Sequence, residues 1–126
     1  MMNTTEVASE LVALCKKGDF TKAMETLYSK DIASVEPMAM GGMPAETQGY
    51  TAVMGKGEWW TNNHEIHSSK VEGPFVHGDQ FIVKFDMDVT NKPSGMRMQM
   101  SETGLYTVSN GKVVREEFFY APMPGM

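Results

Sequence analysis

The sequence predicts an α+β domain in which three N-terminal helices cover one face of a curved, cone-shaped antiparallel sheet. Two observations lead to this fold class. Apolar residues recur at helical spacing as far as Trp60, and beyond it they recur at every second position, as in strands. An Asn-Gly turn at Asn110 and Gly111 is typical of a hairpin between two of those strands. Helices on one face of such a sheet bury a shared core and leave a concavity suited to a small molecule.

The helical part of the sequence contains three segments. The first has Thr4 or Thr5 as a possible N-cap, ends at Gly18, and carries the apolar stripe Val7, Leu11, Leu14 and Cys15. Asp19 is expected to cap a second, short helix with the stripe Phe20, Ala23, Met24 and Leu27, so the two form a helical hairpin. A third helix is expected over residues 50–61.

The remaining segments read as strands and turns. A short strand over 32–36 stops at Pro37, and residues 37–48 form a loop rich in proline and glycine. A meander of four strands follows, over 64–72, 81–90, 96–108 and 113–121. In the second of these, Phe81, Val83, Phe85, Met87 and Val89 face one way, which predicts a strand with one buried and one solvated side.

Composition narrows the class of protein. The 126 residues, 41% of them hydrophobic, favour one folded domain over 1–126, with a core at about 5–120 and a loose tail at 121–126. The net charge of −5 disfavours binding to nucleic acid or to anionic lipid. No apolar run is long enough for a bilayer and no secretory signal is visible, so we expect a cytoplasmic protein without a membrane partner.

Three stretches of the sequence resemble a known superfamily. The segments GDFTKAMETLYSKDIASVEP and TQGYTAVMGKGEWW are similar to the opening of nuclear transport factor 2-like proteins, which include SnoaL-like polyketide cyclases, ketosteroid isomerases and limonene epoxide hydrolases. The segment ETGLYTVSNGKVVREEFFY resembles the terminal hairpin of SnoaL-like proteins. The resemblance spans roughly residues 5–120 and implies the cone fold and a homodimer formed through the outer face of the sheet. It implies no single activity, because this superfamily contains enzymes, binding modules and scaffolds.

The resemblance also suggests two acidic site residues. Glu36, directly before Pro37, holds the place of the proton-shuttling carboxylate of ketosteroid isomerases, and Glu102 holds that of their second acid if the hairpin has one extra residue. The tyrosine that those enzymes place on the first helix falls near Leu11, so the hydrogen-bonding pair that stabilises an enolate is incomplete and steroid isomerase chemistry is disfavoured. The Asp–Arg–Asp arrangement of limonene epoxide hydrolases is not found.

The residues themselves favour Glu102 as the acid of a pocket. It shares strand parity with Met98 and Met100, so it lies at the end of an apolar wall if those methionines line the concavity. Loss of hydration would then raise its pKa and make it a general acid or base. The alternative is a bulge at Thr103-Gly104 that turns Glu102 toward water or toward an arginine.

Three further residues are candidates for contact with a ligand. Glu116 and Glu117 are adjacent on one strand and face opposite ways, so one of them points to the helices, and we assign Glu117 to the pocket. The inward one could equally pair with Arg97 or Lys112. His67 has the parity of Val71 and could enter the pocket, although such a histidine is more often on the surface. Trp60 could cover the pocket mouth or simply pack in the core.

No metal or organic cofactor is predicted. A single cysteine excludes an internal disulfide and a cysteine-based zinc cluster, and the spacing of His64 and His67 places them on opposite strand faces. The methionines at 38–43 and 123–126 could hold Cu(I), but they serve equally as an apolar lid. Three hypotheses about function stay open: an enzyme in which Glu36 or Glu102 moves a proton next to a carbonyl or epoxide of a small apolar molecule, a non-catalytic ligand-binding domain, and a dimerising scaffold.

Overall fold

The structure of the chain is a computed structural model that describes residues 1–39 and 42–121. Its elements follow one another as α1 (Thr4–Lys16), α2 (Phe20–Leu27), β1 (Tyr28–Val35), β2 (Glu46–Gln48), α3 (Tyr50–Asn63), β3 (His64–His77), β4 (Gln80–Asn91), β5 (Met96–Ser109) and β6 (Lys112–Phe119). The predicted α+β class with three N-terminal helices is confirmed. Of the predicted loose tail, residues 122–126 lie outside the described residues.

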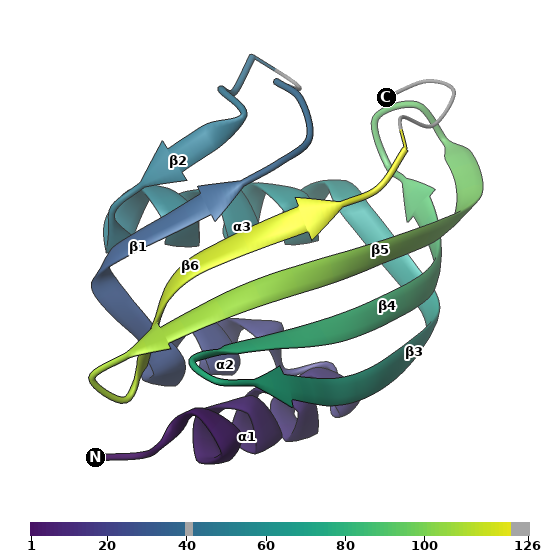
Figure 1. The fold of residues 1–126 in the computed structure, drawn as a ribbon. Coiled ribbons are helices and arrows are strands. Elements are labelled where there is room, and N and C mark those ends of the chain that lie inside the picture. Colours follow the sequence, from purple (N-terminus) through teal and green to yellow (C-terminus); the bar gives the residue numbers. More distant parts are fainter. Residues whose placement is uncertain (40–41, 122–126) are drawn as a thin grey trace.

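The sheet has six strands in the order β2-β1-β6-β5-β4-β3 (Figure 1). Strands β3 to β6 form the predicted antiparallel meander. The expectation of a purely antiparallel sheet is wrong, because β1 pairs in parallel with β6. The chain leaves β1 through β2 and α3 and re-enters the sheet at its far edge, so the meander returns to β1 with β6 running in the same direction.

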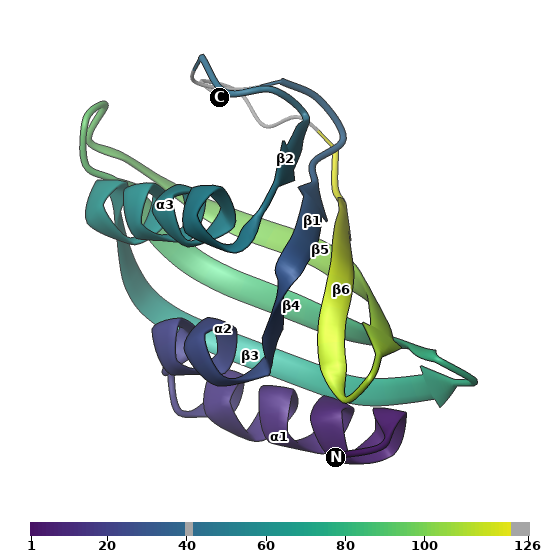
Figure 2. The same ribbon diagram turned by 90° about the vertical axis from the view of Figure 1, so that its left-hand side faces the viewer.

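All three helices lie on one side of this curved sheet (Figure 2). The alternation predicted for β4 is the physical reason, since Phe81, Val83, Phe85, Met87 and Val89 are all buried beneath the helices. These side chains meet the buried stripe of α1, which includes Val7 and Leu11, and so form the main core. Among the described residues, no helix is long and apolar enough to cross a membrane.

The helix ends correct two local predictions. The N-cap of α1 is Asn3, not Thr4 or Thr5: the Asn3 side chain accepts a hydrogen bond from the Glu6 amide, and the Glu6 carboxylate accepts one from the Asn3 amide, both at 2.9 Å. Asp19 does stand at the start of α2, but its side chain makes no capping hydrogen bond. Gly18 between the two helices has φ +77°, a left-handed conformation that glycine adopts at little cost.

Several strands are longer than local sequence predicts. β1 begins at Tyr28, directly after α2, and β3 continues through the cis Gly73–Pro74 bond to His77. In each case a neighbouring strand supplies hydrogen bonds that the local sequence does not reveal: Phe75 pairs with Ile82 beyond the proline, and Tyr28 pairs with Val113. The short strand β2 lies at the end of the predicted 37–48 loop, where it pairs with β1.

Candidate functional site

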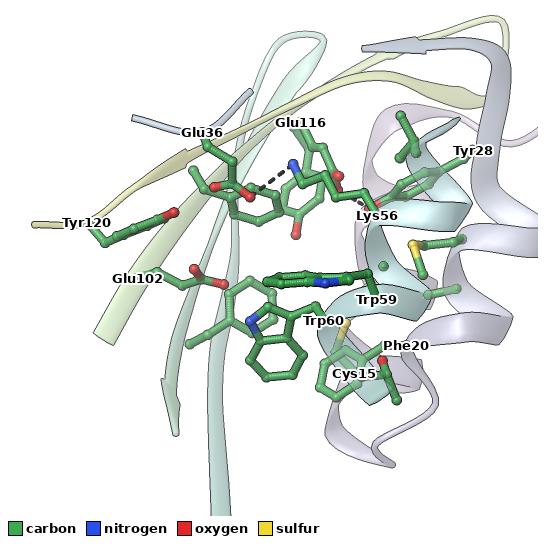
Figure 3. Close-up of a pocket in the computed structure, with 18 of the residues that line it drawn as sticks. Cys15, Phe20, Tyr28, Glu36, Lys56, Trp59, Trp60, Glu102, Glu116 and Tyr120 are labelled. Carbon is green, nitrogen blue, oxygen red and sulfur yellow. Dashed lines mark hydrogen bonds and ion pairs between the residues drawn. The ribbon is translucent and has the colours of Figure 1, made fainter. Parts of the chain in front are cut away.

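A cavity of about 180 Å³ lies between the helices and the sheet (Figure 3). Side chains from α1, α2, α3 and four strands line it. Most of this lining is apolar and includes Leu11, Phe20, Met24, Val53, Trp59, Trp60, Phe85, Met87, Met100 and Phe118. A comparable cavity of about 150 Å³ with apolar walls holds benzene. The pocket is therefore large enough for a small ring compound, whose remainder can extend through the mouth.

Glu116 on β6 is the most deeply buried acid of this pocket. The parallel register pairs it with Ser34 on β1, and the Ser34 hydroxyl donates a hydrogen bond to its Oε2 at 2.6 Å. The Tyr28 hydroxyl donates to its Oε1. Burial raises the pKa of Glu116, and the two hydroxyl donors oppose that rise by stabilising the carboxylate. Burial, and then the negative charge of Glu116, keeps the pKa of Tyr28 well above its usual range.

Lys56 on α3 joins this cluster to a second acid, Glu36, just beyond the end of β1. Its Nζ lies 2.9 Å from Glu36 Oε1 (Figure 3). The same Nζ donates to Ser34 Oγ at 2.7 Å. Both side chains of the ion pair are only 15% exposed, so the pair is largely shielded from water. On the other side of Glu36 lies Tyr120: burial, the Glu36 charge and a hydrogen bond to that carboxylate all raise the pKa of the Tyr120 hydroxyl.

Glu102 on β5 differs from the other two acids because, among the described residues, no donor or cation binds it directly. It pairs across the sheet with Phe85, and Figure 3 shows its carboxyl group pointing into the pocket toward the indoles of Trp59 and Trp60. Burial, and then the charges of Glu36 and Glu116, raise its pKa to about 7, while Lys56 opposes the rise. Both protonation states of Glu102 are therefore populated near neutral pH.

Tyr106 brings a further polar group to the same wall. Its ring is buried, stacks on Phe81 with 4.9 Å between ring centroids, and lies over Gly104. A Cβ on residue 104 would be 3.1 Å from the Tyr106 hydroxyl oxygen, so the absence of a side chain there lets this hydroxyl lie along β5 in the direction of Glu102. Within the described part of the chain no hydrogen-bond partner of that hydroxyl is found. It is available to a ligand.

The pocket also contains the thiol of Cys15 from α1. Burial, followed by the negative charge of Glu116, raises its pKa to about 12. At neutral pH the side chain is thus a protonated, weakly polar part of the wall and not a nucleophile.

The structure brings four of the seven predicted site residues together. Glu36, Glu102, Trp60 and Met100 all line the cavity. The bulge that would have turned Glu102 outward does not occur, since β5 keeps continuous register with β4 from Met96 to Thr107. What these four residues do for a ligand stays a prediction.

The other three predicted residues lie outside the cavity. Glu117 faces away from it and contacts Arg115, 3.6 Å apart, so Glu116 is the inward acid of the pair. His67 is exposed and hydrogen bonds with Thr90 Oγ1 at 2.7 Å, because a register irregularity between Ile66 and Ser68 interrupts the alternation that would have turned it inward. Met98 is half-buried against the core but pairs with Val89, beyond the end of the cavity.

Sequence reasoning missed Lys56 and the tyrosines. Lys56 is next to Gly57 on the face of α3 that carries Val53 and Trp60, so its helical position was a usable signal. Tyr106 shares the strand parity of Met100 and Glu102, so this parity was a usable signal. No local pattern marks Tyr28, which pairs with the distant Val113, or Tyr120, which follows the end of β6. Among residues 1–39 and 42–121, no group of three or more His, Cys, Asp or Glu side chains is arranged to hold a metal ion. The thioether hypothesis also involved Met40, Met123 and Met126, which lie outside the described residues.

Comparison with known proteins places the chain in a family. One similar protein, from Mesorhizobium loti, is provisionally named a SnoaL-like polyketide cyclase, and its name adds carbohydrate phosphatase in brackets. It is 47% identical to this chain, with a TM-score of 0.88 over 94% of this chain and 100% of its own. A Bacillus subtilis protein provisionally named an isomerase is 20% identical, with a TM-score of 0.78 over 96% and 91% of the two chains. A Catenulispora acidiphila protein with the ketosteroid isomerase-like fold, in complex with trimethylamine, is 16% identical, with a TM-score of 0.70 over 94% and 88%.

None of the curated proteins compared with this chain matches it. The family model described as a SnoaL-like domain matches residues 2–120, almost the whole chain. The Mesorhizobium loti relative shares the same fold of three helices on a curved sheet. Because of this shared fold and the match over residues 2–120, we identify the chain as a member of the SnoaL-like family.

Proposed function

We propose that this domain binds a small, largely apolar molecule and transfers a proton on it, as a cyclase or isomerase that needs no cofactor, with Glu102 as the acid–base group. One observation carries the proposal: Glu102 is a carboxyl group without a direct partner in the described part of the chain, in an apolar pocket, with a pKa of about 7. Most carboxyl groups are fully ionised at neutral pH. One whose two forms are both populated can accept a proton and return it.

The proposed reaction begins at a carbon next to a carbonyl group. The Glu102 carboxylate takes the proton, the C–H bond breaks, and the electron pair moves onto the carbonyl oxygen to give an enolate. The resulting Glu102 acid then returns the proton to another carbon. Alternatively, the enolate carbon bonds to a second carbonyl carbon in the same molecule, the C=O π electrons move onto that oxygen, and the oxygen takes the proton from Glu102. The enolate oxygen needs a donor, and the Tyr106 hydroxyl and the Lys56 ammonium are the candidates that line the pocket.

Glu36 takes a different part in this proposal. Its Oε1 is paired with the Lys56 ammonium at 2.9 Å, so taking up a proton would weaken this ion pair. We therefore assign to Glu36 the positioning of Lys56 and an electrostatic effect on Glu102. The names given to the relatives from Mesorhizobium loti and Bacillus subtilis support cyclase or isomerase chemistry, and the trimethylamine complex supports a pocket for small molecules.

Deuterium exchange tests the proposed proton transfer without knowledge of the natural substrate. The ketone 2-tetralone is incubated in D2O with the protein, and NMR follows the loss of its α-proton signals. We expect the wild type to accelerate exchange, Glu102→Gln to lose that acceleration, and Glu117→Gln to keep it. Glu117→Gln is the matched control because the residue lies on the neighbouring strand, outside the pocket.

The same assay separates catalysis from binding alone. Saturable binding of the ketone without any exchange above the Glu102→Gln rate would contradict the catalytic proposal. It would favour the non-catalytic alternative, in which Glu102 only orients a ligand. Native mass spectrometry of the purified protein complements the assay, since a retained small molecule would identify the chemistry to test next.

A further inference from the structure

We infer that the pocket selects molecules that carry a positive charge on an apolar body, such as an aryl ammonium or an iminium ion, and rejects anions. This inference rests on the ligand pocket of the proposed function and adds the charge class of the ligand. Its basis is the number and pairing of the charged groups that line the cavity, together with the aromatic rings beside them.

The charges in the pocket do not balance. Three glutamates line it, Glu36, Glu102 and Glu116, against the single cation Lys56 among the described lining residues. Lys56 is already engaged by Glu36 at 2.9 Å and by Ser34 at 2.7 Å. Glu116 is satisfied by two hydroxyl donors, which carry no charge. The carboxyl group of Glu102 is left without a donor or a cation, and it points into the cavity.

The aromatic rings near Glu102 also suit a cation. Figure 3 shows the indoles of Trp59 and Trp60 on the side of the pocket that Glu102 faces, and both line the cavity. The Trp60 ring is held in place by stacking on His64, with 4.4 Å between ring centroids and 13° between ring planes. Indole faces attract ammonium groups through the negative potential of the ring, most strongly where water is excluded. A cation beside Glu102 therefore meets an acid and lies next to two indole rings.

Binding of a cation must be linked to the protonation of Glu102. The groups that act on this carboxyl group are Glu36 beyond β1, Glu116 on β6 and Lys56 on α3, with the neutral Tyr106 and Tyr120 nearby. A cation favours the ionised form, so its affinity rises with pH through the range in which free Glu102 loses its proton. With a pKa of about 7, the ionised fraction and hence the affinity should be about tenfold greater at pH 8 than at pH 6.

An isosteric pair of probes tests the inference. Phenyltrimethylammonium and tert-butylbenzene have the same shape and differ by one positive charge, and benzoate supplies the anion. Binding to the full chain is followed by the fluorescence of Trp59 and Trp60 between pH 6 and pH 8. We expect the cation to bind about tenfold more tightly at pH 8 than at pH 6, the neutral isostere to bind within about twofold at both, and benzoate not to saturate.

Variants assign the effect to the pocket acid. Glu102→Gln should remove the pH dependence and weaken binding of the cation about tenfold at pH 8, while tert-butylbenzene still binds, which shows that the pocket is intact. Glu117→Gln should behave like the wild type. If Glu102→Gln does not fold, the inference is still tested by the wild type, through the pH dependence of its affinity for the cation and for the neutral isostere.

Two results would overturn the inference. One is binding of tert-butylbenzene together with benzoate but not of the cation, in which case the pocket of the proposed function stands and only the charge class is wrong. The other is a cation affinity that does not change between pH 6 and pH 8. Deuterium exchange on the uncharged ketone tests the proposed function separately, so the two failures can be told apart.

Discussion

The contact between Gly104 and the Tyr106 ring predicts how Gly104→Ala changes the free energy of unfolding. The sign of this change should depend on whether the Tyr106 ring is present. A Cβ at residue 104 would lie 2.8 Å from Tyr106 Cε2, closer than packed atoms approach, and 3.1 Å from Cζ, which is a tight contact. The ring cannot move aside, because it is buried, stacked on Phe81 and in edge contact with Phe118. Overpacking of this kind costs about 1–3 kcal/mol. We therefore expect Gly104→Ala to lower the free energy of unfolding by about that amount.

The same substitution should have the opposite effect once the ring is gone. Gly104 does not have a positive φ, so alanine fits the backbone, and in the interior of a strand it is about 0.5–1 kcal/mol more favourable than glycine. In the Tyr106→Leu background, Gly104→Ala should therefore be neutral or stabilising. Urea unfolding of the wild type, both single variants and the double variant, followed by tryptophan fluorescence, gives the four free energies of this cycle. A Gly104→Ala variant as stable as the wild type would refute the role of this contact.

Three further predictions concern the acids, the ion pair and the outer face. Burial raises the folded pKa of Glu102 from 4.5 to about 7, so the folded state holds this proton more tightly, and stability should fall by up to about 3 kcal/mol as pH rises from 4.5 to 7. Urea unfolding across that range should show the fall in the wild type and a weaker one in Glu102→Gln. Lys56→Met leaves Glu36 without its cation; we expect a loss of about 3–5 kcal/mol and, by NMR titration of labelled carboxyl carbons, a higher pKa for Glu102. Phe75 and Ile82, exposed and paired on the outer face, should lie in the expected dimer interface, so light scattering should detect a dimer that Phe75→Asp converts to a monomer.

Each of these predictions has a direct counter-result. A stability that is flat from pH 4.5 to 7, or a Glu102→Gln variant with the same slope as the wild type, would contradict the environment described for that acid. Unchanged stability of Lys56→Met would mean that its contacts contribute little. A wild-type chain that is monomeric at high concentration would exclude the dimer.

Local sequence patterns were sufficient for most of the fold. The alternation at 81–90 predicted which side chains of β4 are buried, because neighbouring residues of a strand must face opposite ways. The Asn110-Gly111 turn was also predictable, because both residues have positive φ, a conformation that this dipeptide adopts readily. Chain continuity also predicted the order of the meander.

Strand ends and partners were not predictable in this way. Pro74 reads as the end of a strand, yet β3 continues to His77 because β4 offers Ile82 and its neighbours as partners. The parallel pairing of β1 with β6 joins residues more than eighty positions apart, and no local period records it. An irregularity at His67 turned this residue outward although its parity with Val71 suggested the reverse.

Some features of the candidate site could likewise be predicted from the sequence, and others are visible only in the tertiary structure. From the sequence by itself came Glu102 and Met100 on one strand face, Glu36 ahead of Pro37, and the requirement that only one of Glu116 and Glu117 points inward, because each follows from the geometry of a single strand or from a resemblance of its segment. Only the tertiary structure decided that Glu116 is that residue and that Lys56 is bound by Glu36 and Ser34. The raised pKa of Glu102 arises from burial and from charges on other elements. These contacts and this pKa depend on distances that are set only when the helices pack on the sheet.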